Sequence, residues 1–173
     1  MAEELRPKIV KLIKMIGGVA GAMNKIEKTM PEYYALDGVV TDDMADVALC
    51  LGLRQERTLD YIQQKCGKSM QETQKLLDQL CYTGVVKTWK DKKTGKDLYF
   101  VNIFAPGILE MMVNNREQLA AHPEIGRAFE EYTRKRLAPM AALFPEGMAM
   151  MRVVPVESAI KDLPGVQPWE KLS

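Results

Sequence analysis

The sequence is poor in the residues that hold metal ions. Its 173 residues include three cysteines and one histidine, and no two cysteines form a CxxC pair. A zinc or iron–sulfur site needs about four ligands that converge on one point. The residues present therefore exclude such a site unless a partner chain contributes ligands. We expect Cys50 and Cys81 to lie on apolar helix faces, where a free thiol acts as a small hydrophobic side chain.

The chain also lacks long apolar runs and an excess of charge. No run approaches the length of a membrane span, and the first residues mix both charge signs without an apolar signal core. Lysine and arginine together number 24 and acidic residues 23, so the net charge of +1 favours neither a general polyanion binder nor an acidic tail. These features predict a cytoplasmic globular protein with no membrane partner.

Catalytic constellations and phosphate loops are missing as well. His122 stands beside Pro123 at a predicted helix end, so no Ser/His/Asp arrangement can be built around it. The segment GGVAGAMNK lacks the Gly-Lys-Ser/Thr ending of a phosphate loop, and the GKS at 67–69 lacks the required earlier glycine. The sequence predicts no catalytic and no metal-binding residue within this chain.

What the sequence does contain is a series of three capped helices. Thr41, Thr58 and Ser69 each stand where a side-chain oxygen caps the start of an amphipathic helix. Glu72 follows Ser69 at the spacing of a capping box. Glycines end the second and third helices, and only three residues separate these two, which is typical of a helix-turn-helix.

A hairpin follows the third helix. Residues 85–90 and 98–102 are rich in β-branched and aromatic side chains and flank a polar loop that contains a glycine. Three helices and a hairpin in this order predict a winged helix-turn-helix over residues 36–104. The fold class is therefore mainly α with a small β hairpin.

Helical segments flank this core on both sides. We expect an N-terminal helical arm over 1–35 and a helical extension over 105–173 that ends in a tail rich in proline and methionine. Within the extension, Pro106 and Pro123 each suit the first position of a helix.

Winged helices commonly bind DNA, which needs cations for the phosphates and a helix that presents donors to the bases. The hairpin supplies the cations. Residues 87–97 carry five lysines against two aspartates, a local charge of +3. The third helix does not suit DNA binding: residues 69–83 carry one lysine against two acidic residues, and contain no arginine or asparagine. An acidic helix meets a duplex with like charge, in a binding mode dominated by counterion release. The charge pattern thus favours a winged helix that docks to protein.

DNA binding stays open as an alternative, because glutamine can read adenine in the major groove. In that alternative the chain is a transcription regulator, which forms a homodimer through the N-terminal arm and the helix at 124–137. Its DNA-binding candidates are Gln71, Gln74, Lys75, Lys90, Lys92 and Lys93.

Five stretches of the chain, taken together, resemble one known family. They are TDDMADVALCLGL, CGKSMQETQKLLDQL, YFVNIFAPGILEMMVNN, HPEIGRAFEEYTRKRLAPM and GMAMMRVVPVESAI. They resemble the amino-terminal portion of large iron–sulfur proteins of anaerobes. In that family a winged-helix-like front segment precedes a ferredoxin-type 4Fe–4S region, in some members followed by a flavin-dependent oxidoreductase.

The resemblance implies both a role and a missing part. The cluster cysteines of the family follow the region that corresponds to 152–160, and no residue of this sequence matches them. We therefore expect a fragment cut ahead of a 4Fe–4S domain, acting as a non-catalytic module that docks to that domain or to a partner protein. The candidates for an electrostatic patch against an acidic redox partner are Lys92, Lys93 and Lys96.

Overall fold

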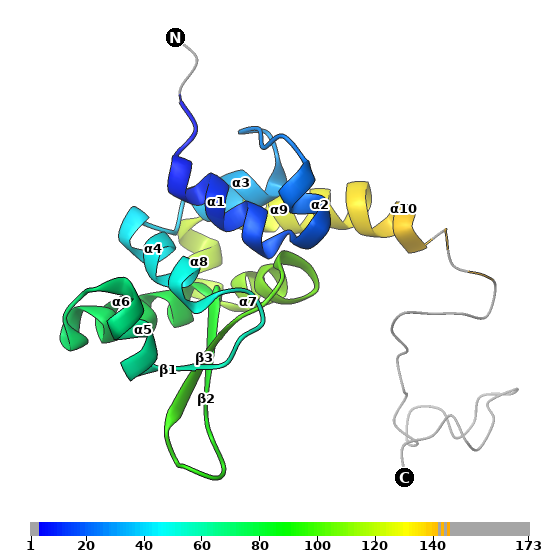
Figure 1. The fold of residues 1–173 in the computed structure, drawn as a ribbon. Coiled ribbons are helices and arrows are strands. Elements are labelled where there is room, and N and C mark those ends of the chain that lie inside the picture. The colour runs from blue at the N-terminus through cyan, green and yellow to red at the C-terminus, as the bar shows by residue number, and fades with distance from the viewer. Residues whose placement is uncertain (1–3, 142, 144, 146–173) are drawn as a thin grey trace, which may run out of the picture.

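The described chain is mainly helical and carries one small antiparallel sheet, as predicted (Figure 1). The computed structural model describes residues 4–141, 143 and 145. Of the predicted extension over 105–173, residues 142, 144 and 146–173 lie outside these residues. Among them, no helix has the length and apolar character needed to cross a membrane.

The elements follow one another in a simple order. The helices of the first half are α1 (Pro7–Ile16), α2 (Gly18–Met23), α3 (Pro31–Asp37), α4 (Asp42–Leu51), α5 (Leu59–Cys66) and α6 (Met70–Thr83). The strands are β1 (Arg57–Thr58), β2 (Val86–Lys90) and β3 (Asp97–Val101). The helices after the sheet are α7 (Leu109–Asn114), α8 (Arg116–Ala121), α9 (Glu124–Tyr132) and α10 (Ala138–Ala141), with the π-helical turn η2 (Thr133–Leu137) before α10.

The predicted caps begin α4, α5 and α6. Thr41, Thr58 and Ser69 each accept a hydrogen bond from the backbone N–H three residues on, at 3.2, 3.4 and 3.2 Å. The side chain of Glu72 binds Lys68 Nζ at 2.9 Å, rather than reaching back to close the capping box. Local side-chain chemistry thus fixes where these helices start.

The sheet has the strand order β1-β3-β2. β2 and β3 form the predicted hairpin, with Val86 opposite Val101 and Lys90 opposite Asp97, and each strand lies within one residue of its predicted bounds. β1 is only two residues long and pairs with β3, so no sequence pattern marked it. The hairpin projects away from the helices (Figure 1).

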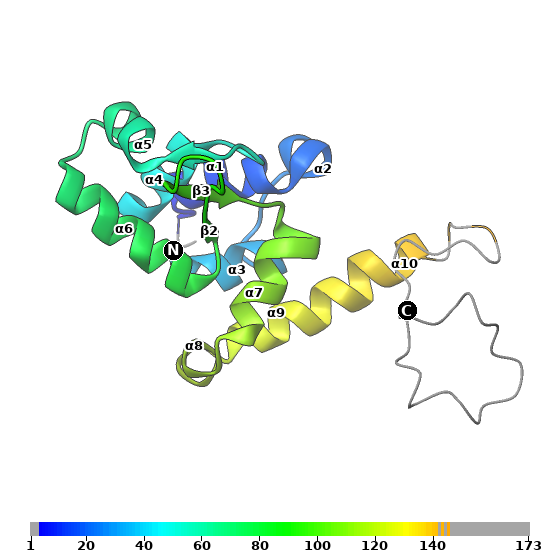
Figure 2. The ribbon, with the colours of Figure 1, turned by 90° about the horizontal axis from the view of Figure 1, so that it is seen from below.

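One hydrophobic core joins the beginning, middle and end of the described chain. α1 buries Ile9, Leu12 and Ile13 and packs against α3 and α4. α3 in turn packs against α9, nearly a hundred residues later in the chain. Beyond that contact, α9 continues through η2 to α10, away from the sheet (Figure 2).

The predicted helix start at Pro106 is wrong. Ala105, Pro106 and Gly107 have non-helical backbone angles, and α7 begins at Leu109. Gly107 has a φ of 154°, which side chains other than glycine rarely adopt, and its N–H donates to the Glu110 carboxylate. This local turn directs the chain from the sheet into α7.

The glycines that end α5 and α6 provide a matched test of the packing. Gly67 and Gly84 both adopt left-handed conformations, with φ of 68° and 84°. A Cβ at Gly67 would meet nothing within 4 Å, whereas one at Gly84 would lie 2.9 Å from backbone atoms of α7 at Met111 and Met112.

We expect Gly67→Ala to lower the free energy of unfolding by about 1 kcal/mol, the cost of the left-handed conformation. Gly84→Ala should cost clearly more, because the backbone of α7 must also move. Urea unfolding of both variants measures the difference. Equal losses would contradict the close approach of α6 to α7.

Candidate docking site

Lys92 and Lys93 lie exposed in the turn that joins β2 to β3. Asp91 holds this turn: its carboxylate accepts the Thr94 hydroxyl at 2.6 Å and the N–H groups of Lys93 and Thr94 at 3.1 and 3.2 Å. The bond from the Thr94 hydroxyl, together with the two N–H bonds, lowers the pKa of Asp91. The hairpin tip is therefore an ordered turn that carries two adjacent cations.

The other hairpin lysines of the predicted sites are paired. Lys90 Nζ lies 3.0 Å from Asp97 and Lys96 Nζ lies 3.6 Å from Asp60 of α5. Both pairs are exposed, where such contacts contribute about 0–1 kcal/mol. Within the described residues, Lys92 and Lys93 have no carboxylate partner, so they carry most of the unpaired positive charge of the predicted patch.

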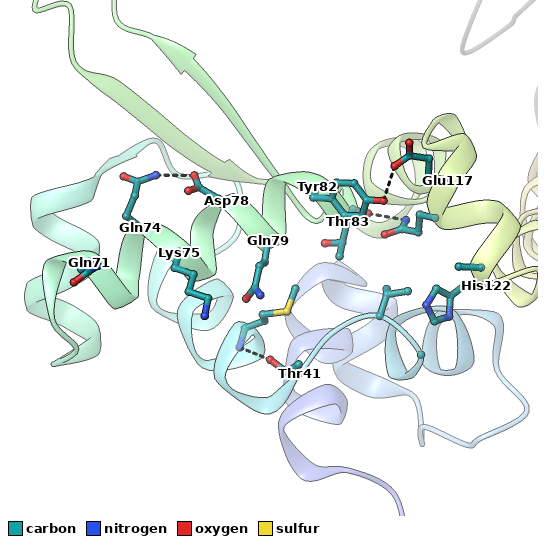
Figure 3. A pocket seen from close by; sticks show the side chains of 15 residues that line it. Thr41, Gln71, Gln74, Lys75, Asp78, Gln79, Tyr82, Thr83, Glu117 and His122 are labelled. Carbon is teal, nitrogen blue, oxygen red and sulfur yellow. Dashed lines mark hydrogen bonds between the residues drawn. The ribbon is translucent and has the colours of Figure 1, made fainter.

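The outer face of α6 forms one wall of an open groove of about 960 Å³. The connection from α3 to α4 and the start of α4 form a second wall, and α8 with His122 closes one end (Figure 3). Lys75 and Gln79 extend toward the start of α4, and Gln71 lies farther along α6 (Figure 3). Three of the residues predicted for DNA contact, Gln71, Gln74 and Lys75, thus line a groove.

Gln74 is also engaged within the protein. Its Nε2 donates to Asp78 Oδ1 at 2.7 Å, and its Oε1 accepts the hydroxyl of Tyr99 from β3 at 3.2 Å. Gln74 and Asp78 belong to the lining of the groove and lie on the side of α6 that faces the hairpin (Figure 3). The structure therefore does not gather the predicted DNA-binding residues into one surface: Gln71, Gln74 and Lys75 line the groove, and Lys92 and Lys93 lie at the hairpin tip.

The α8 end of the groove contains residues that sequence reasoning missed. Tyr82 of α6 donates its hydroxyl to Glu117 Oε2 of α8 at 3.3 Å. Gln118 is only 3% exposed, and its Nε2 donates to the backbone oxygens of Thr83 and Met112 at 3.2 and 3.4 Å. No sequence signal could have found this cluster, because its members lie about 35 residues apart and meet only through the packing of α8 on α6.

His122 lies at the same end and binds an acidic neighbour. Its Nδ1 is 3.0 Å from Glu124 Oε1. A carboxylate accepts hydrogen bonds at neutral pH, so Nδ1 is the donor in this contact. The sequence placed His122 at a helix end, and the structure confirms that position as the C-cap of α8.

The three cysteines are free thiols, each half-buried. Burial, with a hydrogen bond to Cys50, raises the pKa of the Cys66 thiol to about 12. Burial likewise raises the pKa of Cys81 to about 11, and both side chains pack against the core. In the part of the chain that the structure describes, no group of three or more His, Cys, Asp or Glu side chains could hold a metal ion.

Comparison of this chain with protein-family models, with curated proteins and with solved structures finds no match. Functional inference therefore depends on the residues and on the geometry of the groove and the hairpin tip.

The raised thiol pKa values predict slow alkylation. At about pH 8.5 roughly half of an ordinary cysteine is thiolate, but Cys66 and Cys81 stay protonated because that pH lies well below their pKa. We expect iodoacetamide to modify both at least about tenfold more slowly in the folded chain than in urea. Mass spectrometry of digested samples measures the rates. Equal rates in the two states would contradict the burial of these thiols.

Proposed function

We propose that this chain is a non-catalytic docking module of a cytoplasmic iron–sulfur electron-transfer protein. The observation that carries the proposal is the groove along α6. Its described lining contains one lysine, Lys75, against the carboxylates of Asp78 and Glu117, among several amide side chains. A polyphosphate would meet two like charges there, whereas a polypeptide would find donors and acceptors for its backbone.

The proposal includes a winged-helix fold for the core of the chain. The order α4, β1, α5, α6, β2, β3 supports it, as does the three-residue connection between α5 and α6. In DNA-binding members of this architecture the helix at the position of α6 enters the major groove. Here α8 stands beside that helix and adds the exposed carboxylate of Glu117 to the surface a duplex would meet.

The iron–sulfur part of the proposal is supported by the five stretches that resemble the front segment of 4Fe–4S proteins. The cluster would belong to a ferredoxin-type domain, in the same polypeptide or in a partner. The full-length gene product tests this point. CxxC-type cysteine motifs after Ser173 are expected, and a reading frame that stops at Ser173 would contradict a cluster domain in the same polypeptide.

The hairpin tip would steer such a partner. Lys92 and Lys93 lie in the ordered turn of the hairpin, which projects from the helices (Figure 1), and Lys96 lies close by in the sequence. Exposed charges of this kind act mainly on the rate of encounter with a partner of opposite charge, and salt screens them.

Charge reversal of Lys92, Lys93 and Lys96 to glutamate should therefore slow association with an acidic 4Fe–4S ferredoxin. We expect about a tenfold lower on-rate at low salt and a flatter salt dependence, measured by stopped-flow fluorescence. The matched control reverses Lys11, Lys14 and Lys25, three exposed lysines outside the hairpin, and should change the rate much less. An unchanged on-rate in the hairpin variant would contradict docking through the tip.

A DNA-binding transcription regulator is the second candidate, because the order of elements and the unpaired tip lysines also suit that role. Fluorescence anisotropy with a random-sequence duplex at low salt separates the two. The docking proposal expects a Kd in the micromolar range or weaker. Tighter binding with a steep salt slope, lost in Gln71→Ala and Lys75→Ala, would establish the regulator instead.

A further inference from the structure

The α8 end of the groove holds a buried hydrogen-bond acceptor that has no donor. Two backbone carbonyls fix the Gln118 amide through its Nε2 atom. Its Oε1 is buried and has no hydrogen-bond partner among the described residues. A buried polar group without a partner costs about 1–3 kcal/mol. A ligand that donated to this oxygen would remove that cost.

A carboxylate stands beside this acceptor. Gln118 follows Glu117 in α8, and its amide is tied to Thr83, the residue after Tyr82, so the three side chains gather at one end of the groove. The hydroxyl of Tyr82 reaches Glu117 at 3.3 Å, longer than the roughly 2.5–3.0 Å usual for such a bond. Both side chains are exposed, so a cationic donor can replace the hydroxyl at the carboxylate.

This end of the groove also has apolar surface. The described lining includes the apolar side chains of Val39, Met44 and Ala121. Lys75, on α6, is the one lysine or arginine among the described residues of the groove. The side chain that fits these groups best has an apolar stem, several hydrogen-bond donors and a positive charge.

We infer that this end of the groove is a pocket for an arginine side chain of a partner polypeptide, an inference that rests on the docking function proposed above. The guanidinium has five N–H donors in a flat fork, so it can pair with the Glu117 carboxylate and keep N–H groups for a second acceptor at this end, such as the Gln118 oxygen. It can also stack on the exposed ring of Tyr82, while its methylene stem packs on the apolar lining. A lysine has fewer donors and no flat face.

The length of the groove identifies the source of the arginine as a polypeptide. The groove continues from the α8 end along α6 past Gln79 and Gln71 (Figure 3). Each of these amides offers both a donor and an acceptor, which is what a peptide backbone requires. A free guanidinium compound would leave most of the 960 Å³ unfilled.

Titration of the ¹⁵N-labelled chain with the peptide Ac-Ala-Ala-Arg-Ala-Ala-NH₂ tests the inference. We expect saturable shifts in the backbone signals of Tyr82, Glu117 and His122 and in the side-chain amide of Gln118. The same peptide with citrulline, which keeps the shape but not the charge, should bind at least about fivefold more weakly, as charge-assisted bonds are the stronger ones.

Variants test whether the arginine of the peptide contacts Glu117. Glu117→Gln should lower the affinity for the arginine peptide by a similar factor and leave the affinity for the citrulline peptide unchanged. The matched control, Glu130→Gln, removes an exposed carboxylate of α9 that pairs with Arg134, and should leave both affinities unchanged.

Four outcomes would overturn the inference. The first is that no signal at this end shifts at the highest peptide concentration. The second and third are that the citrulline peptide, or a peptide with lysine in place of arginine, binds as tightly as the arginine peptide. The fourth is that N-acetylarginine methylamide binds as tightly as the arginine peptide. The last would assign the site to a free guanidinium compound. If the peptide fails while the hairpin variants still slow association, only this inference fails; if both fail, the docking function fails too.

Discussion

The structure depends on the burial of one face of α6. Leu76, Leu77 and Leu80 are buried in the core, and α6 packs there against α4 and α5. Burying a leucine side chain contributes about 1.5–3 kcal/mol, so any rotation of the helix that exposed these residues would be strongly unfavourable. Because the inner face is fixed, the outer face is fixed as well. The glutamines and Lys75 must therefore line the groove, whatever the partner.

The same constraint changes where the acidic charge of α6 acts. Lys68 binds Asp43 at 3.0 Å and Glu72 at 2.9 Å, and these bonds raise its pKa. The start of α6 is thus close to neutral, although the sequence of the helix alone is acidic. Within the described lining of the groove the carboxylates are Asp78 and Glu117, and neither has a lysine or arginine partner. The negative charge therefore acts where a ligand would lie, rather than at the helix start.

Local signals in the sequence predicted the fold well, and distant contacts could not be predicted. Thr41, Thr58 and Ser69 act within one helical turn, so their caps were visible in the sequence. The Pro106 error arose because the turn around it depends on the conformation of Gly107 and its bond to Glu110. The hairpin tip was found from its composition, whereas the groove needed the packing of α8 against α6.

The central claim is that the outer face of α6 contacts polypeptide. Amide hydrogen exchange of residues 70–83 and 116–122 tests it most directly, with and without an added 4Fe–4S ferredoxin domain. The account predicts slower exchange in both segments when that domain is added, and no change when duplex DNA is added. Protection of 70–83 by DNA, with no protection by the iron–sulfur domain, would contradict it.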